Sequence, residues 1–167
     1  MKRIAIISDT HDNLDAVNAF LARTGGSIDA IIHAGDIVSP FTLRLFKGFK
    51  VYAVFGNNDG EKLLLEKTAE NIGVVLEEAP LFLKINGRSI AVIHGASTPE
   101  KTEQLVEALA RSGLFDIVVY GHTHRVDVRK IGETLVVNPG TLSGYLATTR
   151  TFAVVDLEKL SVEVIEV

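Results

Sequence analysis

The chain has 167 residues, enough for one domain with a sizeable hydrophobic core, and 23% of them are charged. It contains no cysteine, which excludes disulfide bonds, thiolate metal sites and a cysteine nucleophile. The net charge is −4 and the basic residues form no block, so nonspecific nucleic-acid binding is not expected.

The apolar segments are short. No run approaches the roughly 18 apolar residues of a membrane-spanning helix, so none is expected. The amino-terminal MKRIAIISDTH has a basic start, but polar residues from Asp9 onward interrupt it and no small-residue cleavage pattern follows. We therefore expect no signal peptide, no membrane association and a cytoplasmic protein.

Up to Gly73, β-rich apolar runs alternate with helical patterns. The predicted strands cover residues 2–8, 29–35 and 50–56. The predicted helices cover residues 13–24, 40–48 and 60–73. Pro40 suits a first helical turn, and glycines follow the first and third helices as stop signals. This alternation predicts parallel strands joined by right-handed crossovers.

Beyond Gly73 the pattern becomes mainly antiparallel. Asn86-Gly87, inside residues 81–95, is a strong hairpin signal. A helix is predicted over residues 99–113 and a buried strand over 115–121. Two further strand pairs are predicted over residues 125–140 and 150–167. A mainly parallel half followed by a mainly antiparallel half suggests two packed sheets with helices outside.

Five of the predicted strands end in polar residues. In open α/β sheets the carboxyl ends of the strands line one edge, where ligands bind, so these side chains should meet. The candidates are Asp9, His11, Asp36, Asn57, His94, His122 and His124. Imidazole and carboxylate ligands suit manganese, iron, cobalt, nickel or zinc. Seven ligands exceed the need of one ion, but suit two ions roughly 3.5–4 Å apart if one carboxylate bridges them.

The spacing of the pairs Asp9/His11 and His122/His124 fits this interpretation. In an extended segment, residues i and i+2 project to the same side, so each pair would approach one cluster. Several of these residues also have a simpler interpretation. The two histidines of GHTH could form a polar turn, Asp36 could close a turn after a glycine, and NND is turn chemistry.

The motifs together resemble one known family. D-x-H, G-D, G-N-x-D, H-G and G-H-x-H follow in that order from Asp9, and VNPGT at Val137–Thr141 completes the set. This series resembles the calcineurin-like metallophosphoesterase superfamily, and more closely its small single-domain phosphodiesterases. The resemblance implies a single domain over residues 1–167. Its fold would be a four-layer α/β/β/α sandwich, two packed mixed sheets flanked by helices, with the metal site at the carboxyl ends of the strands.

The resemblance also implies a division of the ligands. Asp9, His11 and His124 would hold the first ion; Asn57, His94 and His122 the second; and Asp36 would bridge both. A metal-bound hydroxide would attack phosphorus in line. Mn²⁺ is the first choice, with Ni²⁺, Fe²⁺, Co²⁺ and Zn²⁺ as alternatives. The implied activity is hydrolysis of a small phosphoester, a phosphodiester in the first place.

Two substrate contacts are also predicted. Many relatives carry histidine where this chain has Asn58, which can hydrogen-bond a phosphoryl oxygen but cannot act as a general acid near neutral pH. Arg150 is a candidate phosphate-binding residue. His33 matches no ligand position and is interpreted as structural or as orienting a ligand.

Three questions stay open at this point. The same site would serve a phosphomonoesterase or nucleotidase. The fold also resembles the phosphoesterase-like subunit of the retromer coat, a scaffold that binds protein partners. Edge strands and an apolar hairpin are compatible with a homodimer or homotetramer.

Overall fold

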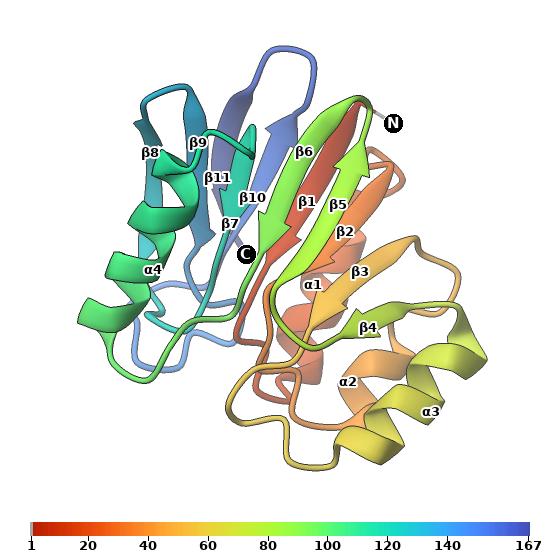
Figure 1. Ribbon diagram of the computed structural model, residues 1–167. Coiled ribbons are helices and arrows are strands. Elements are labelled where there is room, and N and C mark those ends of the chain that lie inside the picture. The colour runs from red at the N-terminus through yellow and green to blue at the C-terminus, as the bar shows by residue number, and fades with distance from the viewer. Residues whose placement is uncertain (1) are drawn as a thin grey trace.

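The computed structural model describes residues 2–167, whose strands form two sheets packed face to face (Figure 1). The first sheet has six strands in the order β11-β10-β1-β2-β3-β4. Its parallel strands are β1 (Arg3–Ile7), β2 (Ala30–His33), β3 (Val51–Val54) and β4 (Val75–Glu77). The antiparallel strands β10 (Thr151–Asp156) and β11 (Ser161–Glu166) complete it.

The second sheet has five strands in the order β5-β6-β7-β9-β8. These are β5 (Leu81–Ile85), β6 (Arg88–Val92), β7 (Ile117–Val119), β8 (Val126–Ile131) and β9 (Thr134–Pro139). Strands β6, β7 and β9 are parallel, while the hairpins β5/β6 and β8/β9 are antiparallel. Asn86-Gly87 forms the predicted turn between β5 and β6, with both residues at positive φ.

The predicted helices form with small changes in length. They are α1 (Leu14–Thr24), α2 (Pro40–Arg44), α3 (Lys62–Ile72) and α4 (Pro99–Arg111). The Asn13 side chain caps α1, and left-handed Gly25 and Gly73 end α1 and α3. Helix α2 is shorter than predicted because residues 45–48 continue as tight turns, such as the bond from the Phe46 amide to the Leu43 carbonyl.

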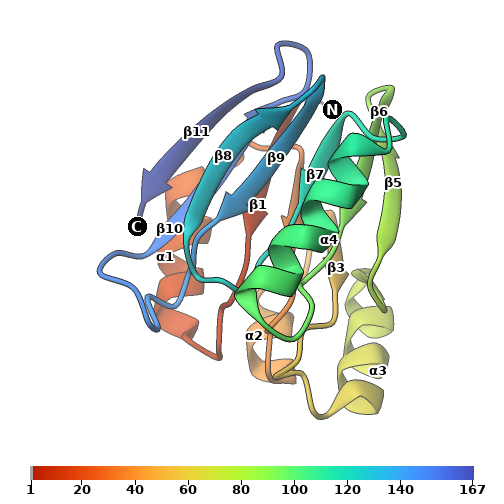
Figure 2. The same ribbon diagram turned by 60° about the vertical axis from the view of Figure 1, so that its left-hand side comes forward.

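Three apolar layers hold the sandwich together. The space between the sheets is filled by residues such as Ile4, Ile6, Ile32, Val92, Val119 and Val155. Helices α1, α2 and α3 cover the outer face of the first sheet, and α4 covers that of the second (Figure 2). The strands alternate their side chains between these layers, because successive residues point to opposite faces. The four-layer prediction is confirmed.

Two details of the topology go beyond the prediction. The last hairpin belongs to the first sheet, where β10 pairs with β1, and both sheets are mixed, as predicted. Strand β4 was not predicted, because its three residues form an edge whose β conformation depends on pairing with β3. Within residues 2–167, no helix is both long and apolar enough to cross a bilayer.

The sandwich core generates a stability prediction. Ile6 is completely buried between the sheets, so Ile6→Ala should lower the free energy of unfolding by about 2–5 kcal/mol. Urea unfolding measures the change. Val128→Ala, on a side chain 41% exposed in β8, is the control and should change it by less than about 1 kcal/mol. Equal urea-unfolding midpoints for the two variants would contradict the burial of Ile6 between the sheets.

Candidate metal centre

All seven predicted ligands lie in loops at one edge of the sandwich. Parallel strands end on the same side, so the loops after β1, β2 and β3 meet those after β6 and β7. The residues concerned are Asp9, His11, Asp36, Asn57, His94, His122 and His124. The contacts among them divide them into two groups, which share Asp36.

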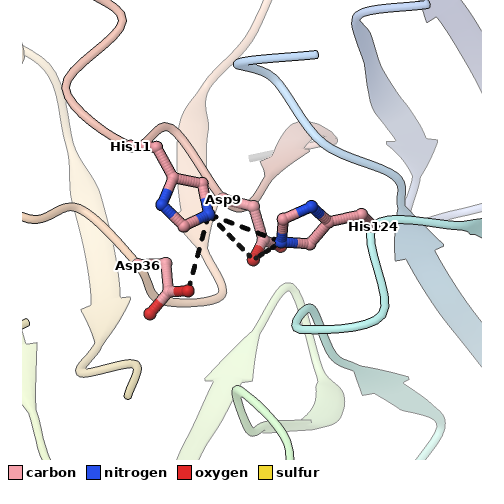
Figure 3. Close-up of side chains that lie close together, drawn as sticks. All are labelled: Asp9, His11, Asp36 and His124. Carbon is pink, nitrogen blue, oxygen red and sulfur yellow. Dashed lines mark hydrogen bonds and ion pairs between the residues drawn. The ribbon is translucent and has the colours of Figure 1, made fainter. Parts of the chain in front are cut away.

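The first group contains Asp9, His11, Asp36 and His124, whose ligand atoms all lie within 4.8 Å of one another (Figure 3). His124 Nε2 lies 3.0 Å from Asp9 Oδ1 and 3.4 Å from His11 Nε2. His11 Nε2 in turn lies 3.6 Å from Asp36 Oδ2. Two carboxylates and two imidazoles thus point at one small volume.

The tautomer of His124 shows why this volume suits a cation. His124 Nδ1 donates a hydrogen bond to the Tyr145 carbonyl at 2.7 Å, so in the neutral ring Nε2 presents a lone pair to Asp9. Asp9 Oδ1 is buried and, within residues 2–167, accepts no hydrogen bond. A buried carboxylate oxygen facing a lone pair is unfavourable unless a cation lies between them. The residues therefore fit a divalent metal ion.

The second group contains Asp36, Asn57, His94 and His122. His94 Nδ1 donates to the Ala34 carbonyl at 2.7 Å, which leaves the Nε2 lone pair facing Asn57 Oδ1 at 3.0 Å and Asp36 Oδ1 at 3.4 Å. As in the first group, hydrogen-bond acceptors face one another here: the lone pair of His94 Nε2 and the side-chain oxygens of Asn57 and Asp36. Asp36 therefore directs Oδ2 to the first group and Oδ1 to the second, as a bridging carboxylate does.

His122 joins the second group through its ring. The ring packs edge-on against His94, with centroids 5.1 Å apart. His122 Nε2 donates to the Ser97 carbonyl at 3.0 Å, so Nδ1 is the nitrogen left for a ligand. The two histidines of GHTH thus belong to different groups, although one residue separates them.

The electrostatics of the site favour positive charge. Burial lowers the pKa of His94, but the Asp36 carboxylate outweighs this effect and the net pKa is raised. The Asp9 carboxylate, 3.0 Å from His124 Nε2, favours the protonated ring, which can donate to it, and so raises the pKa of His124. Burial raises the pKa of Asp36, yet His94 and the donors of Asn58 hold it far below its usual range. Protons and metal ions therefore compete for the same negative cluster.

The backbone of this site is not extended, so our explanation of the i, i+2 spacing is wrong. Five of the seven residues have positive φ: Asp9 (54°), His11 (42°), Asp36 (59°), His122 (67°) and His124 (56°). Left-handed conformations are unfavourable for non-glycine residues and persist only where the surroundings enforce them. The spacing reflects tight left-handed turns that direct side chains inward.

The glycines of the motifs are explained by close approach. A Cβ on Gly56 would overlap Oδ1 and the backbone nitrogen of Asp36, while Gly60 in the same loop has nothing within 4 Å. A Cβ on Gly95 would come within 2.7 Å of His122 Cβ. The glycines next to Asn57 and His94 are thus required because Asp36 and His122, which come from other loops, pack against them.

Two organising residues were not among the predicted site residues. Asp59 is buried and accepts hydrogen bonds from the backbone N–H groups of Asp36, Val38 and Gly56, which ties the loop after β2 to that after β3. Asn138 donates to the Gly121 carbonyl and to Thr123 Oγ1, which supports the GHTH turn. The aspartate of GNND and the asparagine of NPG were the available signals.

The two predicted substrate contacts, Asn58 and Arg150, stay predictions. Both Asn58 donors bind the carboxylate of Asp36, the backbone N–H at 2.8 Å and Nδ2 at 2.7 Å. Asn58 therefore orients Asp36, and its phosphate contact stays a prediction. Arg150 is exposed and its side chain runs beside Gly144. Among the described residues no hydrogen bond or ion pair joins its guanidinium to the seven residues, so its role also stays a prediction.

His33 supports the site from below. Its Nδ1 accepts from the Gly35 N–H at 3.1 Å, so Nε2 carries the proton and donates to Thr10 Oγ1 at 3.1 Å. The Thr10 hydroxyl then donates to the carbonyl of Asp36. Burial lowers the pKa of His33 to about 4, so the ring is neutral in the folded protein at pH 7.

Comparisons with known proteins place nearly the whole chain in one family. A model of the calcineurin-like phosphoesterase superfamily domain matches residues 1–160. A phosphodiesterase of Methanocaldococcus jannaschii is 32% identical over 162 residues, covering 94% of each chain. A probable metallophosphoesterase of Methanothermobacter thermautotrophicus is 28% identical over 167 residues, covering 97% of this chain and 91% of the relative.

Solved structures give the same fold. The structure of a novel archaeal phosphodiesterase superposes with a TM-score of 0.90 at 30% identity and covers 99% of both chains. Vacuolar Protein Sorting 29 from Cryptosporidium parvum has a TM-score of 0.63 at 22% identity, over 99% of this chain and 96% of its own. The second likeness concerns the fold alone.

The close approach at Gly56 generates a prediction. Gly56→Ala should displace Asp36 and weaken binding of Mn²⁺ about 10- to 100-fold, as loss of ligand support does elsewhere. Isothermal titration calorimetry measures the affinity. Gly60→Ala is the matched control, since its Cβ meets no atom within 4 Å. If both variants bind Mn²⁺ as the unaltered chain does, Asp36 is not a ligand.

His33 generates a pH prediction. In the unfolded chain the imidazole takes up a proton near pH 6.5, whereas in the folded protein it does so only near pH 4. The unfolded state therefore binds more protons between these values, and stability falls as the pH is lowered through this window. The difference between the two pKa values of His33 corresponds to about 3 kcal/mol in the free energy of unfolding.

The measurement is urea unfolding in the presence of a chelator at pH 7 and pH 4, for the unaltered chain and for His33→Gln. Because glutamine does not titrate, the free energy of unfolding of the unaltered chain should fall between pH 7 and pH 4 by about 3 kcal/mol more than that of the variant. The other titrating groups are common to both proteins and cancel in the comparison. Equal losses would show that His33 is not held neutral by burial.

Proposed function

Since this chain belongs to the calcineurin-like phosphoesterase superfamily, we propose that it is a metallophosphoesterase that hydrolyses phosphodiesters with two divalent ions. The observation that carries the proposal is the orientation of Asp36. Its two carboxylate oxygens face two separate groups of acceptors, at 3.6 Å from His11 and 3.4 Å from His94. A single ion would leave one of these groups without a cation.

Each ion would have three ligands of its own and would share Asp36 with the other ion. Asp9, His11 and His124 would hold one ion, Asn57, His94 and His122 the other, and Asp36 both. Bound divalent ions supply Lewis acidity that activates water and neutralises charge on the phosphoryl oxygens. In the neutral rings, the Ala34 and Tyr145 carbonyls fix the tautomers of His94 and His124, so that Nε2 of each presents a lone pair to a carboxylate. The Ser97 carbonyl leaves Nδ1 of His122 as the nitrogen available to an ion.

A phosphodiester is favoured by two observations. The Methanocaldococcus jannaschii relative, 32% identical, is named a phosphodiesterase. Beside the second group lies a pocket of about 250 Å³, lined in part by Phe55, Asn57, Ala79, His94 and His122. This pocket offers space for one ester group next to the metal ligands. Asn58 supplies no acidic proton, so we expect a preference for good leaving groups.

The remaining features are proposals of the same kind. The all-nitrogen and oxygen ligand set suits Mn²⁺, with Ni²⁺, Fe²⁺, Co²⁺ and Zn²⁺ as alternatives. We propose a cytoplasmic enzyme that acts on a small phosphoester and forms a homodimer or homotetramer. Purification with metal analysis and light scattering would establish the metal and the oligomeric state.

Hydrolysis of an aryl phosphodiester tests the proposal. The Mn²⁺-loaded protein should release the aryl alcohol, and the activity should disappear with chelator and return with metal. Asp36→Asn and His122→Ala should each lower kcat/KM by at least about 100-fold, because each removes a ligand. Asp15→Asn, an exposed carboxylate in α1, is the control and should retain activity.

Two results would contradict the proposed function. The first is unchanged turnover in both ligand variants. The second is a protein that binds no Mn²⁺ and hydrolyses neither diesters nor monoesters, which would instead favour a scaffold. A clear preference for monoesters would keep the metal centre but replace the diesterase with a phosphomonoesterase or nucleotidase.

A further inference from the structure

The loop between β9 and β10 is bound tightly to the metal-ligand segment after β1. The amide of Leu142 donates to the Ser8 carbonyl, and the amide of Ser143 donates to the Asp9 carbonyl at 3.2 Å. Thr141 Oγ1 donates to the same Asp9 carbonyl at 3.0 Å. These bonds fix the position of the residues that follow, which therefore have a defined place beside the metal centre.

Tyr145 is the residue that this loop presents. Its carbonyl accepts the hydrogen bond from His124 Nδ1, and its amide donates to Ser143 Oγ. The ring lies against the first group, with its centroid 5.5 Å from that of His11 and 5.9 Å from that of His124. Both contacts are edge or tilted contacts at about 60°, namely 63° and 62°.

The ring nevertheless leaves much of its surface to solvent. Tyr145 is 59% exposed, and the next residue, Leu146, is 78% exposed with a φ of 57°. A left-handed conformation at leucine is unfavourable, and here it accompanies an apolar side chain held in water. These two exposed apolar side chains lie next to the polar candidate metal site and do not contribute to the core, so their surface is accessible to a ligand bound there.

We propose that the Tyr145 ring, extended by Leu146, binds an aromatic ester group of the substrate while the phosphoryl group lies at the metal ligands. This inference rests on the proposed function. A phosphodiester carries an organic group on each of two ester oxygens, directly next to phosphorus. Because the ring packs against His11 and His124, a group stacked on it would lie next to a phosphoryl group bound at these residues.

The two sides of the metal centre then receive the two ester groups. The pocket of about 250 Å³ lies beside Asn57, His94 and His122, while Tyr145 lies beside His11 and His124. A phosphomonoester would use only one of these places. The substrate class is therefore a phosphodiester with one aromatic group, such as an aryl or a nucleobase-bearing ester, and a second group small enough for the pocket.

Binding of three phosphate compounds to the Mn²⁺-loaded protein tests this inference. Diphenyl phosphate carries aromatic ester groups, dimethyl phosphate does not, and inorganic phosphate contacts the metal site alone. In the unaltered protein diphenyl phosphate should bind about tenfold more tightly than dimethyl phosphate, the effect of one aromatic stacking contact. Isothermal titration calorimetry supplies the dissociation constants at a low temperature at which no phenol is released during the titration, because diphenyl phosphate is itself a diester that the proposed activity would hydrolyse.

Tyr145→Ala should abolish most of that tenfold difference and leave the dissociation constant of inorganic phosphate unchanged. The carbonyl that holds His124 is a backbone group and is retained in this variant. Tyr145→Phe should keep the preference, because stacking needs the ring and not the hydroxyl. Phe82→Ala, which removes an aromatic side chain 58% exposed in β5, should have no effect on either compound.

Several results would overturn the inference. Equal binding of diphenyl and dimethyl phosphate by the unaltered protein is one. Another is a Tyr145→Ala variant that also binds inorganic phosphate more weakly, because Tyr145 would then act only by supporting the metal ligands. A dimer in the unaltered protein that dissociates in Tyr145→Ala would assign the surface to a second copy of the chain. Failure of the proposed function is distinct, since the unaltered protein would then hydrolyse no phosphoester.

Discussion

The folded chain holds a cluster of acceptors that repel one another. Asp9 Oδ1 is buried without a hydrogen bond and faces His124 Nε2 at 3.0 Å, while Asp36 lies between His11 and His94. Such an arrangement is unfavourable in the absence of positive charge, and a metal ion or a proton relieves it. The ordered sandwich below the site must therefore supply the free energy that keeps these atoms together.

The fold meets this demand with backbone strain and close packing. The left-handed conformations at Asp9, His11, Asp36, His122 and His124 direct their side chains inward, and hydrogen bonds from neighbouring loops hold them there. Asp59 binds groups in the loops after β2 and β3, and Asn138, at the end of β9, binds two groups of the loop after β7. Glycines at Gly56 and Gly95 allow the loops to approach closely enough for these bonds. Strain at the site is thus balanced by the buried core beneath it.

The candidate metal ligands and the proposed substrate surface come from different parts of the fold. The candidate ligands follow central strands, which pair with neighbours on both sides. Tyr145 and Leu146 lie in the connection between β9 and β10, which crosses from one sheet to the other. Because this connection is anchored at Ser8 and Asp9, a side chain beyond the anchor can vary without moving the metal ligands.

The sequence by itself determined the strand–helix alternation, the Asn86-Gly87 hairpin and the convergence of seven polar residues at one sheet edge. These follow from local periodicity and from the rule that parallel strands end on one side. Other features were decided only by tertiary structure: the pairing of β10 with β1, the left-handed turns at the ligands, the bonds from Asn58 to Asp36, and the contact of Tyr145 with two histidines. Each depends on atoms from segments distant in the chain, and no local pattern of residues encodes their approach.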